Sequence, residues 1–190
     1  MLLKTISKAI NLVSLQLYKN NLTGQVPTEL GKFKKLVNLS LYENQLTGPL
    51  PQKIGSWAKF NSIYVSDNFL TGPIPSDMCK QGTMKKLLVL NNKFIGKILA
   101  NYATCTTLIC FRVPNNLLSG TVPGGIWGLP NANIIDITSN NIQGPITPDI
   151  KNAKSLGNCL SETIAYRVKY QPRYPALRRW SPLNSMTISS

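Results

Sequence analysis

The feature that most constrains this chain of 190 residues is an asparagine that returns every 24 residues. It occurs at Asn20, Asn44, Asn68, Asn92, Asn116 and Asn140. Each copy closes a stretch with regularly placed apolar residues; Leu12, Leu15 and Leu17 precede Asn20 in this way. A single unit of this length cannot bury its own apolar side chains, so successive units must stack. The spacing therefore predicts a solenoid, a fold that presents an extended surface.

Within each unit the alternation of apolar residues predicts a short strand. Leu15 and Leu17 point to one face and Gln16 and Tyr18 to the other, because successive side chains of a strand alternate. The period is that of leucine-rich repeats. We therefore predict an α/β leucine-rich-repeat solenoid: a curved coil of about six 24-residue repeats, with a parallel sheet on its concave face.

The repeats set the expected domain boundaries. Residues 10–156 hold the six repeats, and residues 1–9 are a partial N-terminal repeat or an extension. Residues 157–190 fit no repeat and form a basic, proline-containing tail that we expect to be disordered.

The recurring asparagines are expected to be scaffold rather than binding residues. An asparagine side chain in a buried turn carries two donors and an acceptor that can satisfy backbone groups of adjacent coils. Losing one would leave those groups unpaired, at a cost of about 1–3 kcal/mol.

The composition argues against catalysis. The chain has no histidine, which removes Ser-His-Asp and Cys-His hydrolysis, and it has no phosphate-binding glycine loop or protein-kinase motif. Asp67 and Asp136 are the carboxylates nearest the predicted concave face, but three strand spacings separate them by about 14 Å. That is too far for a glycosidase pair. We expect no enzyme activity, no metal and no cofactor.

Charge and hydropathy bear on whether the chain binds nucleic acid or crosses a membrane. The formal net charge of +14 raises nucleic acid as a partner, but the basic residues are spread through the loops and no contiguous stripe is evident. We therefore expect no nucleic-acid partner. No run of about 18 apolar residues predicts a membrane span, and Lys4 and Lys8 interrupt the segment where the apolar core of a secretory signal would lie.

Two of the four cysteines are candidates for a disulfide. None of the four lies in a C-x-x-C pair, so zinc binding is not indicated. Cys79 lies 11 residues after Asn68 and Cys105 lies 13 residues after Asn92, so both should fall on the outer side of adjacent coils. A disulfide between them is geometrically allowed; the alternative is two free thiols that fill small buried gaps.

A second motif carries a family resemblance. It reads glycine, any residue, an apolar residue, proline, at residues 24–27, 48–51, 72–75 and 120–123. This motif resembles the plant-specific leucine-rich repeat of receptor-like kinase and receptor-like protein ectodomains. Further segments, at residues 36–42, 72–80, 102–105, 111–113, 127–130 and 144–150, resemble the HAIKU-type leucine-rich-repeat receptor kinases and their relative, receptor-like kinase seven.

The resemblance implies a right-handed coil of plant-type repeats. It also implies an extracellular domain at the plasma membrane that senses a secreted peptide or protein ligand together with a co-receptor kinase. The family also carries a signal peptide, a membrane span and a cytoplasmic kinase, none visible in this sequence, so we expect a truncated fragment without its own kinase. Two alternatives stay open. One is an intracellular leucine-rich-repeat module that binds a protein partner, which the missing signal favours, and the other is a non-functional truncated gene product.

The outward strand residues are the candidate peptide-binding residues: Gln16, Tyr18, Ser40, Tyr42, Tyr64, Ser66, Arg112 and Asp136. The three tyrosines would form a ladder of aromatic platforms for an extended peptide; alternatively, tyrosine simply suits a half-exposed strand. Arg112 and Asp136 would contact polar peptide groups or pair with each other.

Two glycosylation sequons begin at Asn21 and Asn38. Asn21 should be accessible after its turn, whereas a glycan on Asn38 would stand at the concave edge and obstruct a peptide. In a secreted protein we expect modification at Asn21 more than at Asn38.

Overall fold

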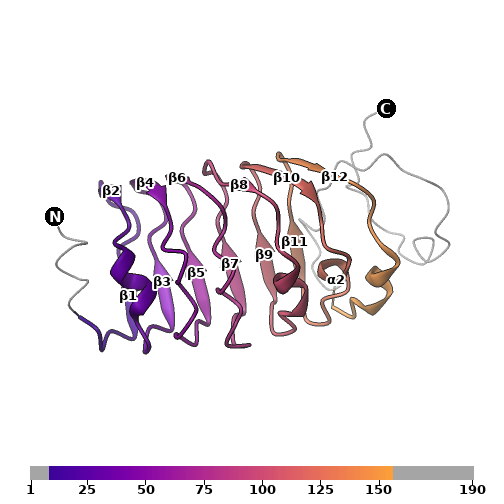
Figure 1. The fold of residues 1–190 in the computed structure, drawn as a ribbon, viewed down its shortest axis with the longest axis horizontal. Coiled ribbons are helices and arrows are strands. Elements are labelled where there is room, and N and C mark those ends of the chain that lie inside the picture. The colour runs from indigo at the N-terminus through magenta and orange to yellow at the C-terminus, as the bar shows by residue number, and fades with distance from the viewer. Residues whose placement is uncertain (1–8, 156–190) are drawn as a thin grey trace.

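The computed structural model describes residues 9–155, which form a row of stacked coils (Figure 1). The tail predicted at residues 157–190 lies outside the described residues, as do residues 1–8 of the predicted N-terminal extension.

One strand from each coil contributes to a six-stranded sheet, in the order β1-β3-β5-β7-β9-β11. The strands are β1 (Ser14–Gln16), β3 (Asn38–Ser40), β5 (Ser62–Tyr64), β7 (Lys86–Leu88), β9 (Cys110–Arg112) and β11 (Ile134–Asp136). All pair in parallel, and each residue aligns with the one 24 positions later. The predicted parallel sheet of a leucine-rich-repeat domain is therefore confirmed.

The core lies on the inner side of this sheet. The central residue of each strand points inward, and Leu39, Ile63 and Leu87 are fully buried. The residues two positions later, such as Leu41 and Val65, are buried as well. The apolar positions of the repeat thus stack into one continuous column, because each coil covers the apolar side chains of its neighbour.

Shorter strands lie beyond the asparagine turns: β2 (Thr23–Gln25), β4 (Gln45–Pro49), β6 (Phe69–Thr71), β8 (Ile95–Gly96), β10 (Leu117–Thr121) and β12 (Asn141–Gln143). They form two three-stranded sheets, β2-β4-β6 and β8-β10-β12. An isolated bridge between Pro73 and Ile95 links the two. Figure 1 shows these shorter strands along the upper side of the row.

Helical turns close four of the described coils. They are the 3-10 helices η1 (Thr28–Lys32), η2 (Ala100–Thr104) and η3 (Pro148–Asn152) and the four-residue α-helix α2 (Gly124–Trp127). A coil of 24 residues that already holds two strands and two turns leaves room for only about one helical turn. The helical part of the predicted α/β architecture is therefore small.

A left-handed turn residue precedes each recurring asparagine. These residues, Lys19, Glu43, Asp67, Asn91, Asn115 and Ser139, have φ between 51° and 55°. This conformation costs most side chains about 1–2 kcal/mol. The turn is nevertheless kept in all six coils, and in five of them the asparagine that follows it donates to a carbonyl of the preceding coil.

Candidate functional site

The outward side chains of the six-stranded sheet form the surface predicted to bind a ligand, here called the sheet face. Two rows run across it at the 24-residue offset. One row holds Gln16, Ser40 and Tyr64, which align strand by strand. The second row, two residues further along each coil, begins with Tyr18 and Tyr42.

Tyr18 and Tyr42 stack face to face. Their ring centroids lie 4.7 Å apart with an angle of 5° between the planes. Tyr18 is 42% exposed and Tyr42 is half-buried. Lys19 and Glu43 follow the two tyrosines, with 3.8 Å between Lys19 Nζ and Glu43 Oε1. The stacked rings of Tyr18 and Tyr42 therefore form an aromatic platform. The opposite charges of Lys19 and Glu43 beside it compensate each other.

Tyr64 does not join this stack, so the predicted ladder of three tyrosines is wrong. Tyr64 aligns with Ser40, because it stands two positions earlier in its repeat than Tyr42 does. The position that continues the row of Tyr18 and Tyr42 is Ser66. The 24-residue offset in the sequence already contains this information, since 18 and 42 differ by one period and 42 and 64 do not.

Ser40 and Ser66 were predicted to face a ligand, and the structure buries both. Ser40 is 2% exposed and Ser66 is 5% exposed, because small side chains in a row of larger ones are covered by their neighbours. Neither hydroxyl oxygen has a hydrogen-bond partner within the described part of the chain. Buried polar groups without partners are uncommon and usually have an explanation.

Arg112 and Asp136 pair with each other, one of the two predicted outcomes. Arg112 Nε and Arg112 Nη2 each donate to Asp136 Oδ2 at 3.2 Å. Asp136 Oδ1 accepts from the Thr138 hydroxyl at 2.8 Å. Because Asp136 is 8% exposed and its two oxygens are occupied, it is a poor candidate for direct ligand contact.

The recurring asparagines form a ladder of hydrogen bonds between coils. Asn68 Oδ1 accepts the backbone N–H of Leu46 at 3.0 Å, and Asn68 Nδ2 donates to the carbonyls of Leu41, Val65 and Ser66. Asn44, Asn92, Asn116 and Asn140 make the same set with their own neighbours.

Asn20 differs from the other five. Its Nδ2 donates to the carbonyls of Leu17 and Tyr18 in its own coil, and the side chain is exposed. The interior asparagines therefore hold neighbouring coils together, while Asn20 braces only its own turn.

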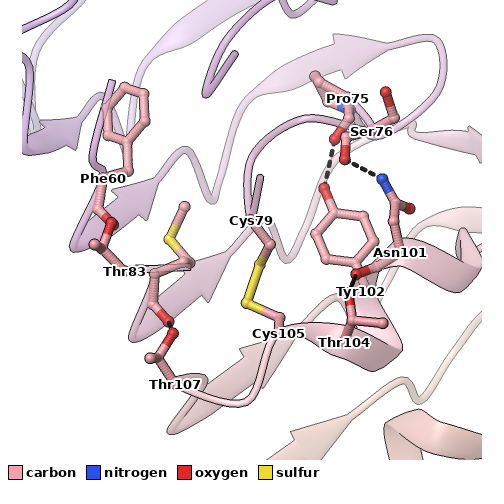
Figure 2. Close-up of a disulfide and its surroundings, with 11 residues drawn as sticks. Phe60, Pro75, Ser76, Cys79, Thr83, Asn101, Tyr102, Thr104, Cys105 and Thr107 are labelled. Atoms are coloured by element: carbon pink, nitrogen blue, oxygen red, sulfur yellow. Dashed lines mark hydrogen bonds between the residues drawn. A yellow bond between two sulfur atoms is a disulfide. The ribbon is translucent and has the colours of Figure 1, made fainter. Parts of the chain in front are cut away.

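Cys79 and Cys105 are joined in a disulfide between adjacent coils, with 5.7 Å between their Cα atoms (Figure 2). Beside it, the buried Tyr102 hydroxyl donates to the carbonyl of Pro75, and Asn101 Nδ2 donates to the carbonyl of Ser76. These contacts join the same two coils as the disulfide. Burial, with a contribution from the charge of Asp77, raises the pKa of Tyr102 above its ordinary value.

Asp77 anchors the same region. Its carboxylate accepts hydrogen bonds from Ser56 Oγ at 2.6 Å and from Ser76 Oγ at 3.0 Å, and Lys80 Nζ lies 3.9 Å away. The bond from Ser56 is the main cause that lowers the pKa of Asp77. These contacts connect neighbouring coils, so we assign Asp77 a structural role rather than a catalytic one.

The two sequons differ in environment. Asn21 is exposed, whereas Asn38 is half-buried in β3, where its Oδ1 accepts from Ser62 Oγ at 2.8 Å. Among the described residues, no cluster of histidine, cysteine or carboxylate side chains is suited to a metal ion. Nor does any helix in residues 9–155 have the length and apolar character needed to cross a bilayer.

Comparisons with known proteins agree with this architecture. A family model described as Leucine Rich Repeat matches residues 11–33. The Arabidopsis receptor kinase HAESA, solved with the peptide hormone IDA and the co-receptor SERK1, is 36% identical, with a TM-score of 0.77 over 78% of this chain and 25% of that chain. The plant peptide hormone receptor RGFR1, in complex with RGF2, is 31% identical, with a TM-score of 0.75 over 79% of this chain and 24% of that chain.

A third structure is comparable in length. The BIR2 ectodomain from Arabidopsis thaliana is 30% identical, with a TM-score of 0.62 over 70% of this chain and 71% of that chain. By contrast, the chain spans about a quarter of the HAESA and RGFR1 structures. No curated protein sequence matches it. Because the repeat, the parallel sheet and these structures agree, the chain belongs to the leucine-rich-repeat family, and its structural neighbours are ectodomains of plant receptors.

Proposed function

We propose that this chain is a ligand-binding segment of a plant receptor kinase ectodomain of the HAIKU type, and that it binds a secreted peptide on the sheet face. The observation that carries the proposal is the partly exposed stack of Tyr18 and Tyr42 on a wide parallel sheet. Tyrosine buries a large area and loses few rotamers on binding, which suits recognition of an extended chain. Two structural neighbours, HAESA and RGFR1, were solved with peptide hormones bound.

The peptide would run across the part of the sheet face that carries tyrosine side chains. Tyr64 and Leu88 continue the surface beyond the tyrosine stack, and both are half-buried. The paired Arg112 and Asp136 form a further, neutralised part of the face. Recognition by the described coils would therefore rest on aromatic and apolar contact more than on charge.

Several features favour an extracellular compartment over the intracellular alternative. A disulfide such as Cys79–Cys105 persists in oxidising compartments and is rare in the cytosol. The exposed sequon at Asn21 fits a glycoprotein. We therefore place the chain at the outer face of the plasma membrane, where it acts in signal transduction with a co-receptor kinase. The described coils themselves would bind and not catalyse.

The length of the sheet face limits its affinity for a peptide. Six strands at a spacing of about 4.8 Å span roughly 24 Å, which accommodates about seven extended residues. Because a flexible peptide loses conformational freedom on binding, we expect a dissociation constant in the micromolar range or weaker.

Calorimetry with a panel of synthetic plant peptide hormones, including IDA and RGF2, tests the proposal. We expect one or more peptides to bind, and a Tyr18→Ala, Tyr42→Ala double variant to bind about tenfold more weakly. Phe69→Ala is the matched control, since Phe69 is an exposed aromatic residue on β6 rather than on the sheet face. Unchanged affinity in the double variant, or equal losses in both proteins, would exclude the tyrosine stack as the binding site.

A further inference from the structure

Five lysines gather at one edge of the six-stranded sheet, at or just before the start of β3, β5 and β7. They are Lys34, Lys35, Lys59, Lys85 and Lys86, here called the lysine edge. The three strands are neighbours in the sheet. The Lys85 N–H donates to the Asn61 carbonyl at 2.9 Å, and the Asn61 N–H donates to the Val37 carbonyl at 2.8 Å. The coils are therefore in contact here, and the fold brings together lysines that look scattered in the sequence.

The charges of the lysine edge are not compensated by nearby carboxylates. All five residues are exposed. The ion pairs within the described residues are Lys19–Glu43, Lys80–Asp77 and Arg112–Asp136, and they involve none of the five. The segments that form this edge, residues 33–38, 57–62 and 81–86, contain no aspartate or glutamate. A row of unpaired cations on adjacent coils creates a local positive potential that attracts anions.

An exposed tryptophan stands in the same edge. Trp57 is 61% exposed and lies two residues before Lys59. Phe33 occupies the equivalent position one repeat earlier and is buried, whereas in the coil of Trp57 the adjacent Ala58 is buried instead. Tryptophan is highly buried on average. Trp57 therefore exposes the flat apolar face of its indole beside lysines that have no carboxylate partner in the described part of the chain. This combination of an apolar ring and positive charge suits contact with a ligand.

We propose that the lysine edge and Trp57 bind a linear acidic polysaccharide. Carboxylates of successive sugar rings lie against the lysines, and one ring face packs on the indole of Trp57. Lysines from three successive coils, which stack at a spacing of about 4.8 Å, form a line rather than an area, and a line of cations suits a thread-like ligand with charge along its length. This surface is separate from the stacked tyrosines, so the inference does not depend on peptide binding.

Two other classes of polyanion fit the edge less well. The cores of protein interfaces are depleted in lysine, so an acidic protein is disfavoured. Proteins that bind single-stranded nucleic acid offer several aromatic platforms to successive bases, whereas Trp57 is the one exposed aromatic side chain in the described segments of this edge.

The test is calorimetry of the full chain with a purified oligogalacturonate at low and high salt. We expect saturable binding that weakens as salt rises. A Lys35→Gln, Lys59→Gln, Lys85→Gln variant should bind about tenfold more weakly or worse. The matched control is Lys93→Gln, Lys97→Gln, Lys151→Gln, which removes the same charge from exposed positions elsewhere and should change affinity by less than about twofold.

Trp57→Ala should also lower the affinity about tenfold, while Trp57→Phe should keep most of it; thermal melts of every variant verify folding. Equal losses in the two lysine variants would show attraction by net charge alone and would overturn the proposal. So would an absence of binding. Tighter binding of polyglutamate or of single-stranded DNA than of the oligogalacturonate would assign the edge to another class of partner and would overturn it as well.

Discussion

At the scale of single residues, the ladder explains why asparagine recurs. Each interior copy accepts one backbone N–H from the preceding coil and donates to three carbonyls, one of them in that coil, as Asn68 does with Leu46 and Leu41. Aspartate lacks the donors and would bring a buried charge, and alanine can make none of these bonds. One amide therefore satisfies backbone groups that the turn would otherwise leave unpaired.

The ladder predicts unequal effects for two chemically identical substitutions. Asn68→Ala should lower the free energy of unfolding by about 2–4 kcal/mol, because it leaves several buried backbone groups without partners. Asn20→Ala, at the exposed asparagine that bonds only within its own coil, should cost about 1 kcal/mol or less. Urea unfolding monitored by circular dichroism measures both. Equal costs would contradict the idea that the bonds between coils carry the difference.

At the scale of elements, the features that recur in every repeat could be predicted from the sequence. The period located the six strands, their inward residues and the asparagine turns, because these depend on spacing alone. The neighbours of a side chain depend on the residues that happen to occupy adjacent coils. Ser40 and Ser66 were therefore misplaced on the open surface, and Tyr64 was assigned to a stack that its register excludes.

The same distinction applies to the lysine edge. Lys35 and Lys59 are one period apart, but Lys85 and Lys86 occupy different positions of their repeat. A search for periodic charge overlooks such a set. The exposure of Trp57 was also hidden, since it depends on Ala58 and not Trp57 filling the core.

Two coils approach each other closely at Gly55, so we predict that a larger residue at this position destabilises the fold. Gly55 has φ +86°, and a Cβ there would lie 2.5 Å from the Asp77 carbonyl oxygen and 2.5 Å from Met78 Cα. Gly55→Ala should cost about 3 kcal/mol or more, since it adds a backbone clash to the strain of a positive φ. Gly82 has φ +65°, and a Cβ added there would meet no atom within 4 Å, so Gly82→Ala should cost about 1 kcal/mol. Thermal unfolding of the two variants gives the comparison, and a tolerated alanine at position 55 would mean that the coils are less tightly packed.

The disulfide should stabilise the junction of its two coils. Cys79 and Cys105 are separated by 26 positions, and closing a loop of that size stabilises by about 3.5 kcal/mol in the chain-entropy model. We expect protein secreted into an oxidising compartment to show the Cys79–Cys105 linkage in a non-reduced digest analysed by mass spectrometry. Reductant should lower the melting temperature of the native chain and leave a Cys79→Ser, Cys105→Ser variant unchanged. Two freely alkylated thiols in folded, secreted protein would refute the pairing.

At the scale of the whole molecule, the first and last strands of the six-stranded sheet each pair with one neighbour among residues 9–155. Within the described residues β1 pairs with β3 alone, and Ile10 and Val13, which precede it, are exposed. A strand edge flanked by exposed apolar residues can pair with another chain, and natural proteins protect such edges with charge or with a covering element.

We therefore predict that the chain associates through the β1 side as its concentration rises. Val13→Lys should shift size-exclusion elution toward the monomer, because a charged side chain beside the open strand opposes pairing between chains. The matched control is Leu117→Lys, which adds the same charge to a similarly exposed apolar residue on β10, away from that edge, and should leave association unchanged. If the unmodified chain elutes as a monomer at every concentration, β1 is not an open edge in solution. If both lysine variants dissociate the assembly equally, added charge rather than the edge strand controls association.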